Sequence, residues 1–84
     1  YYGAVRRIAG HNVGIIGFGN IGRAFANRIR GFGPSEILAY DPYVSQIDAD
    51  IYGVKMVELE ELLEIPKQEE EFYLFEVPET KKQC

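Results

Sequence analysis

The segment Val13–Gly22 reads VGIIGFGNIG and joins a short apolar run to three closely spaced glycines. Unbroken apolarity over Val13–Gly17 favours a strand that is buried on both faces, as strands of parallel sheets are. After the glycines, four apolar residues recur at helical spacing: Ile21, Phe25, Ile29 and Phe32. This spacing predicts an amphipathic helix of about three turns that follows the strand directly.

Helix-breaking residues and a second apolar run follow. Gly31, Gly33 and Pro34 end the helix, since glycine and then proline are typical beyond a helix C-terminus. The next strand is predicted at Ile37–Tyr40, and Asp41-Pro42 ends it because proline cannot donate a hydrogen bond to the sheet. Strand, helix and strand together span about 30 residues, the size of a βαβ unit. The two strands are therefore expected to be parallel, with a right-handed crossover.

Weaker patterns cover the rest of the chain. After Tyr43 we expect one helical turn, then a short strand at Val54–Val57. A helix is predicted at Glu58–Glu64, with its end at Pro66 and with three leucines on one face: Leu59, Leu62 and Leu63. A last strand is predicted at Phe72–Phe75.

Size and charge narrow the possible functions. The chain has 84 residues, a net charge of −4 and a first residue, Tyr1, that indicates a fragment or a processed chain. Residues 1–35 hold five arginines and no acid, whereas all Asp and Glu residues lie from Glu36 onward. A basic first half would favour a nearby anionic ligand, although solvated helix and loop surface is the simpler interpretation. The basic residues are too few, and too little mixed with aromatics, for a nucleic-acid module.

Two further features concern the surroundings of the protein. The apolar runs are too short for a membrane span, so no membrane partner is expected. Cys84 is the single cysteine, which excludes an internal disulfide and favours a reducing compartment, the cytoplasm.

The hexapeptide Gly17–Gly22 matches G-x-G-x-x-G, the dinucleotide-binding fingerprint. Such a match alone is weak, but this one follows a predicted strand and opens a predicted helix. An acidic residue, Asp41, also ends the next strand, roughly 20 residues further on, as the fingerprint requires. These features predict an α/β fold with a Rossmann-type parallel sheet and flanking helices. The fold is incomplete, as the first mononucleotide-binding half: residues 1–12 are a lead-in, 13–78 the partial NAD-binding domain and 79–84 a polar tail. With the second half absent, the strand Val13–Gly17 should keep one uncovered edge.

Each residue of the fingerprint has a physical role. Gly17 permits the tight turn, Gly19 lets a pyrophosphate approach the backbone, and Gly22 lets the helix pack closely. The N–H groups of Asn20 and Ile21 then point at the phosphate oxygens.

The acidic residue sets the cofactor. Asp41 would accept hydrogen bonds from the adenosine ribose hydroxyls and repel the 2′-phosphate of NADP, which favours NAD. Pro42 and Tyr43 either line the adenine slot or pack at the surface. Two alternatives stay open: glycines that only shape a turn, and FAD as the nucleotide.

Other candidate residues give weaker indications of function. His11 is the only histidine and lies before the first strand, so we assign it no catalytic role. The acidic run Glu69–Glu71 is interpreted as an exposed loop rather than a metal site. The sequence contains no Ser–His–Asp or Cys–His set for hydrolysis.

The sequence resembles the D-isomer-specific 2-hydroxyacid dehydrogenases. The resemblance extends from about Arg7 to Leu63. It rests on the stretches Gly14–Arg23, Gly31–Gly33 and Leu38–Tyr43, and on Gly53-Val54 followed by Glu58–Leu63. It implies that Asn20 and Ile21 hold the pyrophosphate of NAD and that Asp41 holds the ribose. A strand ending in a valine-proline pair near the adenine would place Pro78 at the cofactor as well, although the preceding Pro66–Glu71 stretch is more acidic than the family pattern.

The resemblance also implies a function. The family transfers hydride between NAD and a D-2-hydroxy acid or its 2-oxo form, and the parent enzyme would be a homodimer. Its catalytic arginine, glutamate and histidine lie downstream of this region, and no residue here matches them. The chain is therefore expected to be the inactive NAD-binding portion of an oxidoreductase, with the substrate bound by a missing domain. A non-catalytic, corepressor-like NAD-sensing module and a truncated product without function are the alternatives.

Overall fold

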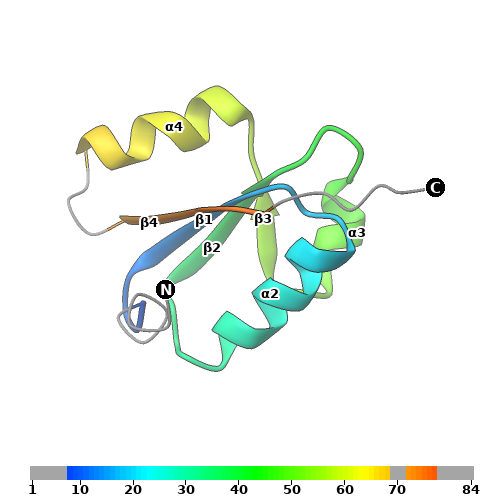
Figure 1. The fold of residues 1–84 in the computed structure, drawn as a ribbon, viewed down its shortest axis with the longest axis horizontal. Helices are drawn as coiled ribbons and strands as arrows, with labels where there is room; N and C mark the ends of the chain where they lie inside the picture. Colours follow the sequence, from blue (N-terminus) through cyan, green and yellow to red (C-terminus); the bar gives the residue numbers. More distant parts are fainter. Residues whose placement is uncertain (1–7, 69–71, 78–84) are drawn as a thin grey trace.

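The computed structural model describes residues 8–68 and 72–77 (Figure 1). Strands and helices alternate in the order β1 (Asn12–Ile16), α2 (Asn20–Arg30), β2 (Glu36–Tyr40), α3 (Gln46–Asp50), β3 (Val54–Met56), α4 (Leu59–Gln68) and β4 (Phe72–Glu76). The alternation agrees with the predicted α/β class, and the strand bounds differ from the predicted ones by a residue or so.

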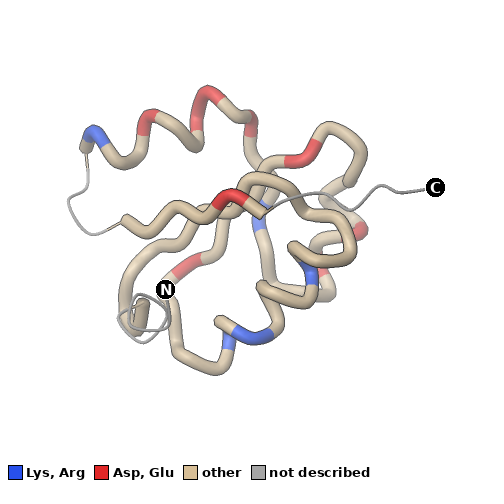
Figure 2. The backbone as a smooth tube through the Cα atoms, viewed as in Figure 1, with Lys and Arg blue, Asp and Glu red and all other residues tan. Residues whose placement is uncertain are grey.

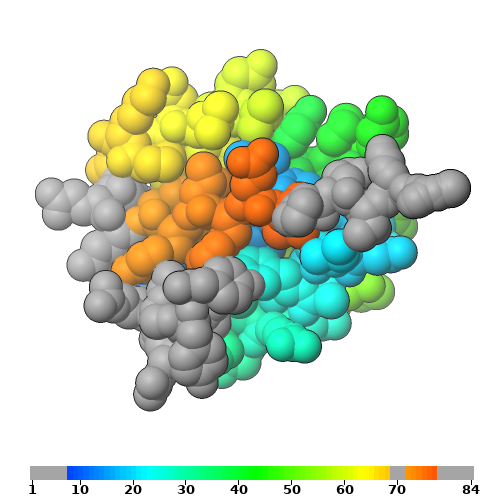
Figure 3. Space-filling model, in the orientation of Figure 1, coloured from blue at the N-terminus to red at the C-terminus, as the bar shows by residue number. Residues whose placement is uncertain are grey.

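All four strands are parallel, in the order β3-β2-β1-β4. The expectation that the first strand keeps an uncovered edge is wrong, because β1 pairs with β2 on one side and with β4 on the other. Gly14 at its centre lies in register with Leu38 and Leu74. The outer strands of this sheet are β3 and β4, and β4 lies at the surface between α4 and α2 (Figure 3).

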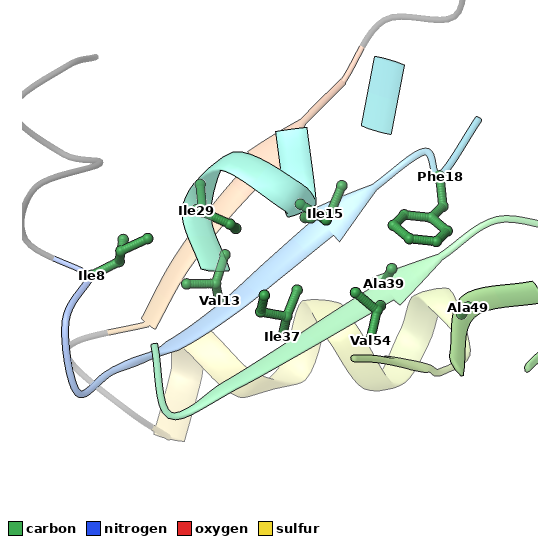
Figure 4. Packing of buried hydrophobic residues seen from close by; sticks show 10 residues of the cluster. Ile8, Val13, Ile15, Phe18, Ile29, Ile37, Ala39, Ala49 and Val54 are labelled. Atoms are coloured by element: carbon green, nitrogen blue, oxygen red, sulfur yellow. The ribbon is translucent and has the colours of Figure 1, made fainter. Parts of the chain in front are cut away.

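Helices cover both faces of the sheet, with α2 and α3 on one face and α4 on the other (Figure 1). Because side chains alternate along a strand, β1 supplies both layers. Val13 and Ile15 join the larger core under α2 and α3 (Figure 4), whereas Ile16 packs on the smaller core under α4. The buried members of the smaller core are Leu38, Leu62 and Phe72.

The buried face of α2 differs from the predicted one. It consists of Gly22, Ala26 and Ile29, a stripe at helical spacing, whereas Ile21 is 41% exposed. Ile21 precedes Gly22 by one position and so is rotated by about 100° from that stripe. Phe25 lies at its margin, where its ring contacts that of Phe75 edge to face with the centroids 4.9 Å apart.

Helix α4 continues past the predicted end, with Pro66 inside it. Proline removes one backbone hydrogen bond, but here it does so in the last turn. Ile65 packs on the smaller core and holds that turn against the sheet, which explains the extension. The apolar face is also shifted, because Leu62 is fully buried and Leu63 is 46% exposed. In the described part of the chain, no helix is long and apolar enough to cross a membrane.

Candidate functional site

The turn between β1 and α2 depends on Gly17. Its φ is +100°, a conformation that residues with a side chain rarely adopt. Its N–H donates to the Tyr40 carbonyl at 2.8 Å, and a Cβ at this position would lie 2.8 Å from the Val77 carbonyl oxygen. The turn is therefore tied to the ends of both neighbouring strands and excludes any residue but glycine.

The other two glycines of the fingerprint serve different purposes. A Cβ on Gly22 would overlap the Gly17 carbonyl oxygen, so glycine lets the first helical turn lie directly on the loop. Gly19 has an ordinary φ of −77°, and a Cβ there would meet no atom within 4 Å. The fold itself does not need glycine at position 19, and the open space above it has room for a ligand.

No side chain of α2 caps the N–H groups at its N-terminus or offsets the positive end of its dipole. Its N-cap is Gly19, which offers no side-chain acceptor, and its first turn holds no acidic residue. By contrast, the N-cap Ser45 of α3 accepts a hydrogen bond from the Asp48 N–H at 3.4 Å. Free N–H groups and the positive end of the helix dipole favour a bound anion, so this helix start fits a pyrophosphate.

Asp41 is the one charged or polar side chain buried among the described residues, with 7% of its surface exposed. Its Oδ2 accepts the N–H of Phe18 at 2.8 Å, and its Oδ1 accepts the N–H of Tyr43, also at 2.8 Å. A carboxylate offers about four acceptor positions, so two remain for further donors such as ribose hydroxyls. The predicted acid therefore lies against the glycine turn, as the fingerprint requires.

A pocket of about 440 Å³ opens at the carboxyl ends of β1, β2 and β4. Its lining comprises Ile16, Gly17, Tyr40, Asp41, Pro42, Glu76 and Val77. After β3 the chain returns to the other side of β1, so the β1–β4 boundary is the point at which the strand order reverses. Open parallel sheets bind ligands at this point, outside the carboxyl ends of their strands.

The structure separates the residues that were expected near the adenine. Pro42 lines the pocket, whereas Tyr43 is 90% exposed and is not among its lining residues. Pro78 lies outside the described residues. Sequence reasoning missed Glu76, which adds a second acid to the pocket opposite the β2 wall. Its position at the end of the last predicted strand was the available signal.

Phe18 was also missed, because it occupies a variable position of the fingerprint. Its side chain is fully buried in the larger core, with its ring 5.7 Å from that of Tyr52 at an interplanar angle of 90°. The carbonyl of Phe18 accepts a hydrogen bond from Arg23 Nε at 3.2 Å. An aromatic residue within a glycine-rich turn is the sequence signal that points to such an anchor.

The remaining candidates among the described residues lie away from the pocket. His11 precedes β1, at the amino ends of the strands and so opposite the pocket, where its ring contacts Tyr73 at 6.0 Å between centroids. Arg28 and Arg30 lie in the last turn of α2, far from its N-terminus, and the acidic residues of α4 lie on the other side of the sheet (Figure 2). The run 69–71 lies outside the described residues. Within the described ranges, no cluster of His, Cys, Asp and Glu could hold a metal.

Comparison with known proteins identifies the same region. The family described as D-isomer specific 2-hydroxyacid dehydrogenase, NAD binding domain, matches residues 2–79. D-3-phosphoglycerate dehydrogenase of Mycobacterium tuberculosis is 45% identical over 56 residues, which are 67% of this chain and 10% of that protein. Glyoxylate reductase of Korarchaeum cryptofilum is 40% identical over 75 residues, 89% of this chain and 21% of the reductase.

Solved structures agree with this result. A phosphoglycerate oxidoreductase from Rhizobium etli superimposes with a TM-score of 0.66 at 30% identity, over 82% of this chain and 20% of that one. The apo-structure of D-lactate dehydrogenase from Escherichia coli has a TM-score of 0.56 at 40% identity, over 66% of this chain and 17% of the enzyme. The chain thus spans about a tenth to a fifth of the length of these relatives.

The resemblance seen in the sequence is therefore confirmed, and so is the partial Rossmann-type fold. The helix start at Gly19, the carboxylate of Asp41 and the pocket between β2 and β4 fit the pyrophosphate and ribose of NAD. The chain belongs to the D-isomer specific 2-hydroxyacid dehydrogenase family, as part of its NAD-binding domain.

Proposed function

We propose that this chain binds the adenosine diphosphate half of NAD in the pocket at the β1–β4 boundary. The N–H groups of Asn20 and Ile21 bind the pyrophosphate, and Asp41 accepts the ribose hydroxyls. Pro42 forms one side of the adenine slot, and the family resemblance assigns Pro78 to the same cofactor. The observation that carries the proposal is an uncapped helix N-terminus beside a buried carboxylate at the point where the strand order reverses.

Asp41 also accounts for the choice between NAD and NADP. Asp41 and Glu76 both line the pocket, and none of its lining residues is basic. A 2′-phosphate on the ribose would approach one carboxylate directly and come near a second, without a cation to balance its charge.

For the longer protein we propose hydride transfer between NAD and a D-2-hydroxy acid, in either direction. NAD, when bound, supplies the hydride acceptor or donor. Residues 13–78 of this chain orient it, and the residues that bind the acid and move its proton lie outside, so the chain alone is inactive. Relatives named D-3-phosphoglycerate dehydrogenase and glyoxylate reductase support this substrate class.

The location, oligomeric state and partners of the longer protein are proposed from the sequence. We place it in the cytoplasm, because the single cysteine suits a reducing compartment. We infer that it is a homodimer that acts on small molecules rather than on nucleic acid or membranes. The low number of basic residues supports the exclusion of nucleic acid.

Titration of the amide NMR spectrum with NAD and NADP tests the proposed site. We expect NAD to shift the signals of Gly19, Asn20, Ile21 and Asp41, and to bind at least about tenfold more tightly than NADP. Asp41→Asn should reduce that ratio, because it removes the repelling charge.

Glu60→Gln is the matched control, since it removes one negative charge from the exposed side of α4. Its NAD-to-NADP ratio should equal that of the wild type. A well-dispersed spectrum that responds to neither nucleotide would refute the proposal.

A further inference from the structure

Phe18 is held at three points, although it lies in the loop that meets the nucleotide. Its N–H donates to Asp41 Oδ2 at 2.8 Å, and its carbonyl accepts Arg23 Nε at 3.2 Å. Its ring is fully buried and points into the larger core toward Ala39 and Val54 (Figure 4). The turn is therefore held by contacts within the chain itself.

Arg23 connects this turn to a distant part of the chain. Its guanidinium carbon lies 5.8 Å from the centroid of the Phe18 ring and 6.0 Å from that of Tyr52, which precedes β3. A planar guanidinium can contact two aromatic rings while it donates to a carbonyl, whereas a lysine ammonium lacks both the plane and the fixed donor geometry. Arg23 is partly buried, so these contacts are only partly exposed to water.

We propose that Arg23 is a positioning residue for the pyrophosphate-binding turn. It acts through Phe18: it fixes the carbonyl and ring on one side, while Asp41 fixes the N–H on the other. The amides at the start of α2 are thereby aligned for the pyrophosphate before NAD arrives, which lowers the ordering cost of binding. The inference rests on the proposed NAD site and adds a residue that does not itself contact the nucleotide.

The variants Arg23→Lys and Arg23→Gln separate positioning from charge. If Arg23 positions the turn, both variants weaken NAD binding by about fivefold, because neither retains the planar contacts. Adenosine, which has no pyrophosphate, should bind both variants as it binds the wild type. Arg28→Gln removes the same charge from the far end of α2 and should leave both affinities unchanged.

Amide hydrogen exchange without nucleotide gives an independent measurement. In both Arg23 variants the Phe18 amide should exchange faster, while the amides of Val13 and Ala39 in the sheet keep their rates. Slow exchange at Phe18 together with full NAD affinity in Arg23→Lys would overturn the proposal and indicate a direct charge contact with phosphate. If the wild type failed to bind NAD, the proposed function would fall, yet the exchange rates would still decide whether Arg23 holds the turn.

Discussion

Gly19 and Gly22 lie only three positions apart, yet alanine should act differently at the two sites. At Gly22 it should lower stability, whereas at Gly19 it should lower NAD affinity. At Gly22 the added Cβ meets the carbonyl oxygen of Gly17, and backbone atoms cannot move aside as a flexible side chain can. At Gly19 the same Cβ meets no atom within 4 Å, and the φ of −77° is acceptable for alanine. Gly22→Ala therefore strains the fold, whereas Gly19→Ala only fills the open space in which we propose that the pyrophosphate binds.

The magnitudes follow from this geometry. Gly22→Ala gains about 1 kcal/mol of helix propensity but meets an overpacking cost of about 1–3 kcal/mol, increased because the neighbour is backbone. We expect a net loss of about 1–2 kcal/mol, or a fall of about 1 M in the urea midpoint. Gly19→Ala should stay within about 1 kcal/mol of the wild type, because a weaker N-cap is offset by a less flexible unfolded chain.

NAD binding should distinguish the two variants in the opposite sense to stability, because here Gly19→Ala is the variant that is affected. The methyl group of Gly19→Ala would lie where we propose that the pyrophosphate binds, so NAD affinity should fall by at least about tenfold while the fold stays intact. Urea unfolding followed by circular dichroism and calorimetric titration with NAD measure the two quantities on the same samples. Gly19→Ala with wild-type NAD affinity, or Gly22→Ala with wild-type stability, would refute the reasoning.

Three further substitutions test the packing of α4 on the sheet. Leu62→Ala truncates a fully buried side chain and should cost about 3 kcal/mol, lowering Tm by more than about 10 °C in a thermal scan. Gly14→Ala places a Cβ 2.7 Å from Phe72 Cζ and 2.9 Å from Leu62 and Leu74, and should cost about 1–2 kcal/mol in urea unfolding; an unchanged midpoint would show that these side chains can move aside. Pro66→Ala restores a backbone donor in an exposed turn and should raise the free energy of unfolding by at least about 1 kcal/mol, so a less stable variant would contradict the assigned helix.

Local sequence patterns predicted the part of the fold that local chemistry determines. The apolar run before Gly17, the helical spacing after it and the Asp41-Pro42 break each act over a few residues, and the structure has β1, α2 and β2 in these places. Asp41 was predicted at the end of the second strand, and because a βαβ unit brings the ends of its two strands together, its carboxylate lies beside the turn.

The features that were missed depend on contacts between distant residues. Ile65 extends α4 beyond its expected end because it packs on the sheet, and a local pattern shows only the proline that follows it. Phe18 is an anchor because Tyr52 and Asp41 lie beside it, and both come from elements that follow α2 in the sequence. The place of β4 beside β1 likewise depends on how the chain returns after α4.

These distant contacts make the site and the fold depend on each other. The Val77 N–H donates to the Ile16 carbonyl at 2.9 Å, and the Val77 carbonyl oxygen would lie 2.8 Å from a Cβ on Gly17. The end of β4 therefore lies directly against the glycine turn, although β4 is an outer strand of this sheet. A ligand that binds only the folded form stabilises it by about 2.7 kcal/mol at a hundred times its Kd, a large share of the stability of so small a domain. NAD bound at the β1–β4 boundary would thus stabilise the pairing of β4 with β1, just as this pairing helps to form the site for NAD.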